Sequence, residues 1–254
     1  MDMQRKLQDM AAAARLAGDT VRSKSGFRVE RKAQNDYVTE MDVLSETLIR
    51  DYLLGRYPED AFYGEESGQA GNERGRFIVD PIDGTTNFIH GISPYSVSIA
   101  YELDGVVELG CVYCPITGEL FTAQRGHGAY LEGQRLHVSD EPLNMAIIGT
   151  SFAHRDTACN ARMLRLFPKL CPQVNDLRRL GSAAYDLCMA AAGRYGAFME
   201  LKLNLYDFAA GMLMVQEAGG VVTAWDDGDD FLQSGNILAG SPQIVSQLKE
   251  IIQE

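Results

Sequence analysis

The chain has 254 residues, of which 46% are hydrophobic and 23% charged, a composition typical of a globular protein with one large domain or two closely packed ones. Lys and Arg total 23 against 35 Asp and Glu, so the formal net charge is −12. Such an acidic surface repels nucleic-acid phosphates and anionic membranes, which are therefore not expected partners, and a phosphate-bearing substrate would need bound cations to compensate locally.

The cysteines and the first ten residues indicate a protein of a reducing cellular compartment without a membrane-spanning segment. The five cysteines are scattered and odd in number, which does not indicate a disulfide framework. Cys111 and Cys114 form a lone CxxC pattern in a strand-like run, and one such pair favours structural thiols over a metal site. Residues 1–10 do not resemble a signal peptide, and no apolar run reaches membrane-spanning length. We therefore expect a cytoplasmic protein.

The first half of the chain predicts two helices followed by a β-rich region. Apolar residues recur at helical spacing near the start, and later apolar runs are strand-like, one of them ending in an Asp-Pro-rich loop. The expected helices are 7–17 and 43–52, and the expected strands are 77–79, 95–101, 106–113 and a glycine-punctuated region at 121–131.

The second half of the chain alternates between helices and strands. Gly219-Gly220 is typical of a helix C-terminus, and Pro242 is typical of a helix start. The expected strands are 147–151, 197–201 and 221–224, and the expected helices are 158–167, 182–192, 208–218 and 242–252. Because helices and strands alternate in both halves, we expect a layered α+β fold. It would comprise two closely packed α/β subdomains, residues 1–140 and 141–254.

The most informative stretch is the nine-residue string Asp80–Phe88, which follows a short strand. Asp80 and Asp83 stand three apart with a proline between them, so a turn can direct both carboxylates at one point. Hard cations such as Mg²⁺ prefer carboxylate and carbonyl oxygens. Gly84 permits a sharp turn, and a helix starting at Thr85 would direct free N–H groups toward an anion. The string predicts a cation and a phosphate in one pocket, although either Asp dipeptide alone would indicate an ordinary turn.

Three other acidic stretches have an ordinary local explanation beside a functional one. Residues 39–42 match a helix capping box with Thr39 as the N-cap. The adjacent acids Glu65 and Glu66 are typical of a solvated surface. Neighbouring carboxylates repel one another, and gathering several of them at one site is costly without a counter-charge. Asp207 fits a helix N-cap, and the small residues that follow it allow close packing near a site.

Taken together and in this order, the four stretches resemble the inositol monophosphatase family in its bacterial branch. The matching segments are 32–42, 64–67, 80–88 and 207–220, and the third is highly specific. The resemblance implies a layered α-β-α-β-α sandwich, usually a homodimer, that uses two or three Mg²⁺ ions and is commonly inhibited by Li⁺.

The resemblance also implies a set of metal ligands, most of them in residues 1–140. The first ion would be held by Glu65, Asp80 and the backbone carbonyl of Ile82. The second ion would be held by Asp80, Asp83 and Asp207, the last of these from residues 141–254. Glu65 would approach a third, weaker ion through water.

Catalytic and substrate-binding roles follow from the same resemblance. The backbone amides of Gly84 and Thr85 would bind the phosphate. Thr85, hydrogen-bonded to Asp42, would orient the attacking water together with Glu65. The substrate's alcohol part would meet residues of the second half, namely Ser182, Ala183, Glu200 and Asp207. One departure is that tyrosine, Tyr206, stands where the family usually has tryptophan, which weakens the choice of substrate and leaves the metal site unaffected.

The expected reaction is Mg²⁺-dependent hydrolysis of a small phosphate monoester by water, with inositol monophosphate as the leading substrate. Other substrates handled by relatives stay open: histidinol phosphate, 3′-phosphoadenosine 5′-phosphate, NADP and fructose 1,6-bisphosphate. A hypothesis of a different class is a regulatory protein that binds transcription or RNA machinery, a role given to some bacterial relatives. The net charge disfavours direct RNA binding but permits a protein partner.

Overall fold

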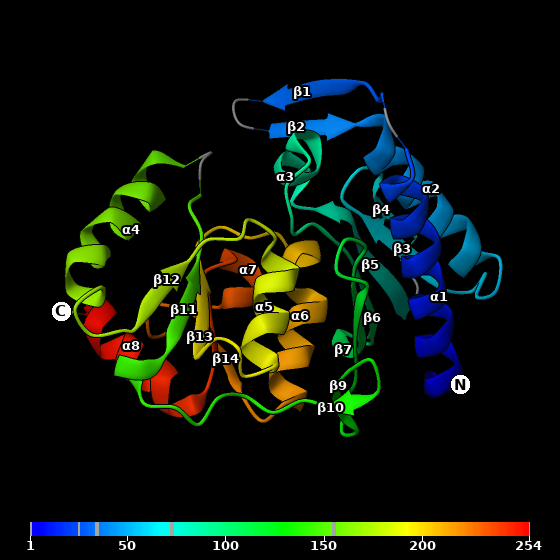
Figure 1. The fold of residues 1–254 in the computed structure, drawn as a ribbon. Coiled ribbons are helices and arrows are strands. Elements are labelled where there is room, and N and C mark those ends of the chain that lie inside the picture. Colours follow the sequence, from blue (N-terminus) through cyan, green and yellow to red (C-terminus); the bar gives the residue numbers. More distant parts are fainter. Residues whose placement is uncertain (1, 25, 34–35, 72–73, 154–155, 254) are drawn as a thin grey trace.

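The computed structural model describes residues 2–24, 26–33, 36–71, 74–153 and 156–253, which form five layers in the order α-β-α-β-α (Figure 1). The layered sandwich expected from the sequence is thus confirmed. The three helical layers, taken across the molecule, are α1 (Met3–Arg22) with α2 (Glu40–Leu54), then α5 (Ala183–Ala191) with α6 (Leu205–Glu217), and last α4 (Thr157–Leu170) with α8 (Pro242–Gln253).

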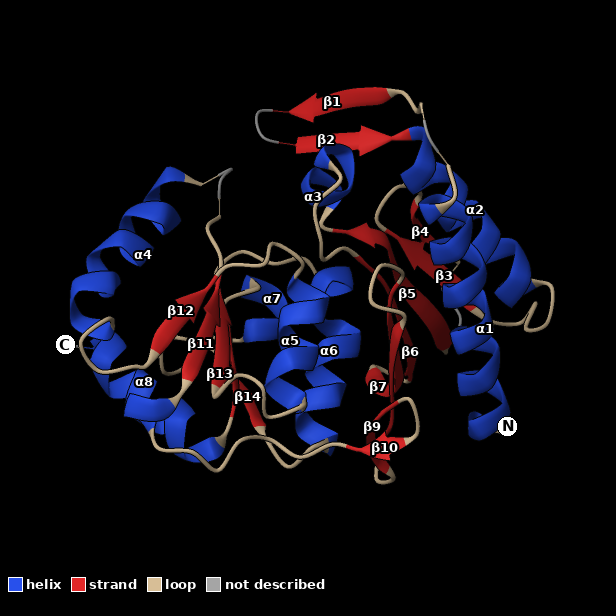
Figure 2. Cartoon of the chain, viewed as in Figure 1, coloured by secondary structure: helices blue, strands red, loops and turns tan. Residues whose placement is uncertain are grey.

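The larger sheet lies between α1 and α2 on one face and α5 and α6 on the other (Figure 2). Its strand order is β10-β9-β8-β7-β6-β5-β3-β4, antiparallel except for the β3–β5 pair. Its strands are β3 (Ala61–Gly64), β4 (Gly68–Ala70), β5 (Gly75–Asp83), β6 (Ser96–Leu103), β7 (Val106–Cys114), β8 (Glu119–Gln124), β9 (Gly128–Leu131) and β10 (Gln134–Arg135). A separate hairpin, β1 (Val29–Ala33) with β2 (Asp36–Thr39), precedes α2.

The smaller sheet has the order β12-β11-β13-β15-β14 and mixes parallel and antiparallel pairs. Its strands are β11 (Ile147–Thr150), β12 (Asp176–Arg178), β13 (Ala197–Glu200), β14 (Val221–Thr223) and β15 (Ile237–Gly240). Three short helical segments complete the described chain: α3 (Thr85–His90), a 3₁₀ turn (Leu143–Met145) and α7 (Phe231–Ser234).

Burial explains the position of each helical layer. Helix α1 is amphipathic, and its small residues Ala13, Ala14 and Ala17 let it approach the large sheet closely. Helix α5 is buried at every position, as expected for a helix covered by a sheet on each side. The central layer therefore joins the two sheets, and α6 packs on strands of both.

The elements predicted from the sequence are present, with ends shifted by a few residues. The capping box at Thr39 and Asp42 is confirmed. The N-cap prediction for Asp207 is wrong, because α6 begins earlier at Leu205 and Asp207 is the third helical residue, bonding back to Asn204. The buried, free thiols of Cys111 and Cys114 agree with structural cysteines.

The proposed subdomain division at residue 140 stays a prediction. The strands of the large sheet come from residues 61–135 and those of the small sheet from residues 147–240, one set on each side of it. Among the described residues, no helix has the length and apolar character needed to cross a membrane.

Candidate active site

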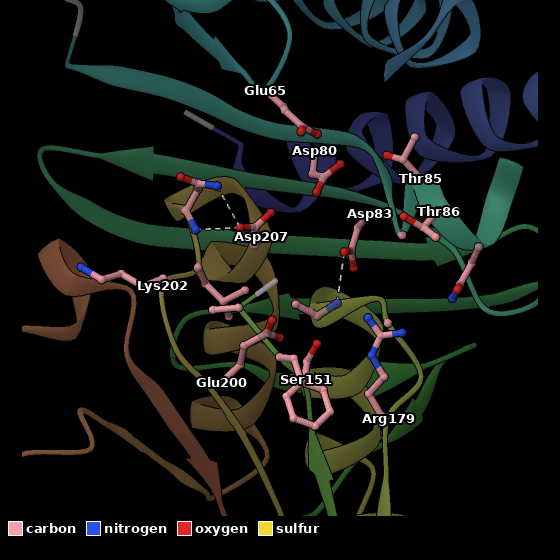
Figure 3. Close-up of a pocket in the computed structure, with 18 of the residues that line it drawn as sticks. Glu65, Asp80, Asp83, Thr85, Thr86, Ser151, Arg179, Glu200, Lys202 and Asp207 are labelled. Carbon is pink, nitrogen blue, oxygen red and sulfur yellow. Dashed lines mark hydrogen bonds between the residues drawn. The ribbon is translucent and has the colours of Figure 1, made fainter. Parts of the chain in front are cut away.

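A pocket with an acidic wall opens between the end of β5 and the end of β13 (Figure 3). It brings together residues that lie far apart in the sequence. From the first half it takes Glu65, Asp80, Ile82, Asp83, Gly84 and Thr85, and from the second half Ala183, Glu200 and Asp207. The two other predicted site residues, Asp42 and Ser182, are fully buried and hydrogen-bond to residues that line the pocket.

The turn after β5 sets the geometry of this pocket. The register of β5 against β6 is irregular between Asp80 and Asp83, and the Ile82 N–H donates to Asp80 Oδ1 at 3.1 Å. Gly84 has φ +95°, and a Cβ there would lie 3.0 Å from the carbonyl oxygen of Gly181. Both the conformation and the space therefore require glycine before α3 begins.

Crowded negative charge surrounds Asp80, which is 2% exposed. Burial raises its pKa well above the ordinary value, and the nearby charges of Glu65, Asp83 and Asp207 raise it further. Burial, followed by the charge of Asp83, raises the pKa of Asp207 to about 7. These carboxylates repel one another, and a bound cation would relieve that repulsion.

The carboxylate of Asp83 is held by the start of α5. The Ser182 hydroxyl donates to Oδ2 at 2.6 Å, the Ala184 N–H to Oδ2 at 2.8 Å and the Ala183 N–H to Oδ1 at 3.1 Å. Ser96 Oγ adds a donor at 3.3 Å. The structure thus gives Ser182 and Ala183 a role in positioning Asp83, and their contact with substrate stays a prediction.

Asp42 lies behind the turn and contacts Thr85. Its Oδ2 accepts from the Thr39 N–H at 2.7 Å and from the Thr39 hydroxyl at 2.6 Å, while the Thr85 hydroxyl lies 3.2 Å from its Oδ1. Burial raises the pKa of Asp42 even though these hydrogen bonds oppose the shift. The capping box and the predicted pairing with Thr85 therefore use opposite oxygens of one carboxylate.

Glu46 is a buried acid beside the candidate site that the sequence reasoning missed. It is 3% exposed on α2, and its two carboxylate oxygens accept the N–H groups of Glu66 at 2.8 Å and Ser67 at 2.9 Å. Gly64 leaves it room, since a Cβ there would lie 2.3 Å from Glu46 Oε2. Glu46 thereby fixes the turn that carries Glu65. The available signal was its spacing of four from Asp42, which puts both acids on one helix face.

The far side of the pocket belongs to the second half of the chain. Glu200 ends β13 with 9% exposure, and burial, followed by the charges of nearby aspartates, raises its pKa well above the ordinary value. Ser151 hydrogen-bonds to it and opposes that shift. Arg179 and Lys202 also line the pocket, and neither belongs to a motif recognised in the sequence.

The donor set is one of oxygen atoms, which suits Mg²⁺ rather than a softer ion. Within the described ranges, no three His, Cys, Asp or Glu side chains are already gathered so that they could hold a metal ion. Protein donors draw Asp83 toward α5 and Asp207 toward Asn204. The carboxylates therefore face one pocket without forming a complete cage, and the metal ligands stay a proposal.

A five-layer sandwich with an acidic pocket beside a helix-opening turn is the architecture of the sugar-phosphatase class of folds. Residues 3–254 match the model of the Inositol monophosphatase family, and the chain belongs to that family. It is 39% identical to Nus factor SuhB of Vibrio cholerae, over 95% of this chain and 93% of that protein.

Solved structures share the fold, among them those of two relatives. The extragenic suppressor protein suhB from Bartonella henselae superposes with a TM-score of 0.93 at 38% identity, over 97% of this chain and 98% of that chain. The inositol monophosphatase from Anabaena superposes with a TM-score of 0.87 at 30% identity, over 100% of this chain and 97% of that chain.

Proposed function

We propose that the chain is a Mg²⁺-dependent phosphatase that hydrolyses small phosphate monoesters, with inositol monophosphate as the leading substrate. The observation that carries the proposal is that the carboxylates of Glu65, Asp80, Asp83 and Asp207 share one pocket with the Gly84–Thr85 turn. Without a cation, the carboxylates would repel the phosphate that the turn is proposed to bind. A bound metal ion would neutralise the carboxylates and allow both groups to act in one pocket.

The buried Asp80 carboxylate, whose pKa is raised by burial and by neighbouring acids, fits a divalent cation that prefers oxygen ligands. The ligands would be those implied by the family resemblance: Glu65, Asp80 and the Ile82 carbonyl for one ion, and Asp80, Asp83 and Asp207 for another. When bound, the ions would neutralise charge on the phosphoryl oxygens and lower the pKa of a water molecule.

The protein's own groups would bind and orient the reactants. The backbone N–H groups of Gly84 and Thr85 would donate to the phosphoryl oxygens. The Thr85 hydroxyl has one proton to give, and Asp42 Oδ1 and the Ile82 carbonyl lie 3.2 and 3.0 Å away as acceptors. With that proton engaged, the hydroxyl oxygen can accept from the attacking water, which Glu65 would hold from the other side. Glu200 would accept hydroxyl groups of the alcohol.

A phosphate-release assay on the purified chain tests the proposal. The substrates are inositol 1-phosphate, histidinol phosphate, 3′-phosphoadenosine 5′-phosphate, NADP and fructose 1,6-bisphosphate, each with Mg²⁺ and with EDTA. We expect turnover that EDTA abolishes, that Mg²⁺ restores and that Li⁺ inhibits. Undiminished turnover after thorough chelation, or no hydrolysis of any compound, would contradict the proposal.

A homodimer and a cytoplasmic location remain part of the proposal, and light scattering of the purified chain tests the homodimer.

A second candidate function is regulation through a protein partner, favoured by the name Nus factor of a curated relative. Capture of the same partner by the wild type and by an inactive Asp83→Asn variant would support a binding role separate from catalysis. The exclusion of nucleic acid rests on net charge alone, and a gel-shift assay with RNA tests it.

A further inference from the structure

A groove separate from the candidate active site lies on the outer helical layer of α4 and α8. Its volume is about 510 Å³, within the range of ligand pockets, and it shares no lining residue with the acidic pocket. Its apolar lining residues are Leu166, Trp225, Ile251 and Ile252. The described residues that line it include no acid, although the net charge of the chain is −12.

The charged residues of this groove are three cations of α4, namely Arg162, Arg165 and Lys169. Positions three and four apart share a helix face, so the three side chains form one stripe, with Leu166 on the same face. Arg165 and Lys169 are exposed to solvent, and Figure 1 shows α4 and α8 as an outer layer of the sandwich. The groove therefore has a basic wall beside an apolar floor.

The charges of the basic wall are only partly compensated by the protein. The guanidinium of Arg162 donates to both oxygens of Asp226, at 2.8 and 2.6 Å, and its central carbon lies 5.2 Å from the ring centroid of Trp225. In the part of the chain that the structure describes, no carboxylate forms an ion pair with Arg165 or Lys169. Two exposed cations are thus available to a partner.

The combination of an apolar floor and two available cations discriminates between classes of ligand. Inorganic phosphate would use only the cations, and exposed ion pairs alone contribute little to affinity. A nucleic acid would be repelled by the net charge of −12, and the ring of Trp225 is 0% exposed, so it offers no face on which a base could stack. An amphipathic helix with carboxylates beside its apolar stripe would use both features.

We propose that the groove between α4 and α8 docks an acidic amphipathic helix of a partner protein. Apolar side chains of that helix lie on the floor, and its carboxylates pair with Arg165 and Lys169. Salt screens charges beyond about 8 Å at physiological ionic strength, so these two cations outweigh the more distant acids of the chain. The docking surface lies outside the candidate active site and does not depend on phosphatase activity.

Trp225 makes occupancy of the groove measurable, because it is the only tryptophan in the chain. The ligand to be titrated is a synthetic peptide of about 18 residues, long enough to form a helix. It has leucines three and four positions apart, glutamates beside them, no tryptophan and a dansyl group. We expect saturable energy transfer from Trp225 to the dansyl group, with a dissociation constant in the micromolar range.

Arg165→Gln/Lys169→Gln should weaken binding of this peptide by about tenfold, because two ion pairs are lost. The matched control is Arg22→Gln/Lys24→Gln, which removes two exposed cations at the end of α1, in the helical layer farthest from the groove (Figure 1). The control should bind like the wild type. Added salt should weaken binding to the wild type and to the control more than binding to the groove variant.

A peptide with serines in place of the leucines keeps every carboxylate and should not bind measurably. Binding as tight as that of the leucine peptide would show a site for anions alone and would reject the inference. The inference is also overturned if the wild type gives no saturable transfer or if the groove variant and the control bind equally. A lower molar mass of the groove variant in light scattering would instead show an interface between copies of the chain, and would reject a foreign helix.

Discussion

The Ser182 hydroxyl donates a hydrogen bond of 2.6 Å to Asp83 Oδ2, and this contact ties the end of β5 to the start of α5. The two residues are 99 positions apart and belong to opposite halves of the chain. Because Asp83 also accepts two backbone N–H groups of α5, a predicted metal ligand is at the same time the acceptor that anchors the central helical layer. Catalysis and stability should therefore change together at this position.

Asp83→Asn should abolish most activity and also destabilise the fold. Asparagine replaces one acceptor oxygen by an NH₂ group, which then faces donors of α5. We expect the free energy of unfolding to fall by about 1–3 kcal/mol. Turnover should fall by about 100-fold or more, since a charged ligand is lost. Urea unfolding and Mg²⁺-dependent phosphate release measure the two effects.

Ser182→Ala is the control for that variant, because it removes one donor to Asp83 and keeps the carboxylate. It should lose about 1 kcal/mol of stability and retain most of the turnover. An Asp83→Asn protein with wild-type turnover would refute the site assignment.

Glu46→Gln should weaken Mg²⁺ binding at the site, although Glu46 is not itself a proposed metal ligand. The amide has one oxygen for two N–H groups, those of Glu66 and Ser67, so the turn that carries Glu65 loses an acceptor. Residues that support a metal ligand typically contribute 10–100-fold to metal affinity. We expect the Mg²⁺ concentration for half-maximal activity to rise by about tenfold, with a smaller change in turnover at saturating Mg²⁺.

Asp51→Asn, on an exposed position of the same helix, serves as the comparison and should leave the Mg²⁺ titration unchanged. If the two variants give the same Mg²⁺ curve, Glu46 does not support the Glu65 turn.

The sequence predicted the regular elements well where the hydrophobic pattern is strong. Helix α1 and strands β6 and β7 have long apolar patterns and were found directly. The β1–β2 hairpin was missed because Val29–Ala33 is mostly charged and lacks an alternating apolar face. The strand Ile237–Gly240 was missed because four buried residues show no period, and its place in the sheet depends on pairing with β13 and β14.

Site residues that lie close together in the sequence could be predicted, and those that only the fold brings together could not. The β5 turn carries its ligands within a few residues of one another, so a motif can reveal them. Glu46 and Arg179 join the pocket region only through folding, one from a helix face and one from a loop after β12. The double role of Asp83 was also invisible, because it depends on the orientation of α5, which no local pattern encodes.

Stability should fall in acid partly through Glu119. Burial would raise its pKa, but hydrogen bonds from Tyr185, Arg194 and Thr117 outweigh that effect and lower it. A carboxyl group with a depressed pKa contributes stability above its unfolded pKa, about 4.3, and that contribution is lost as the pH falls through the lower folded value. Glu119→Gln should therefore lie below the wild type by about 1–2 kcal/mol at pH 7 and approach it near pH 3.

Urea unfolding at pH 7, 5 and 3 measures this difference, and Glu250→Gln, at an exposed position of α8, is the control. A gap between Glu119→Gln and the wild type that stays constant with pH would show that the hydrogen bonds do not favour the ionised form.

The buried ion pair of Lys6 and Asp60 should show strong coupling between its partners. Lys6 is 0% exposed, and its ammonium lies 3.7 Å from the ring centroid of Tyr101, which in turn donates a hydrogen bond to Asp60 at 3.0 Å. Lys6→Met leaves Asp60 buried without its counter-charge and should cost about 3–5 kcal/mol of stability. The double variant Lys6→Met/Asp60→Asn removes both charges and keeps an acceptor for Tyr101, so it should recover most of that loss. A double-mutant cycle by urea unfolding measures the coupling, and additive losses would show that the charges do not depend on each other for burial.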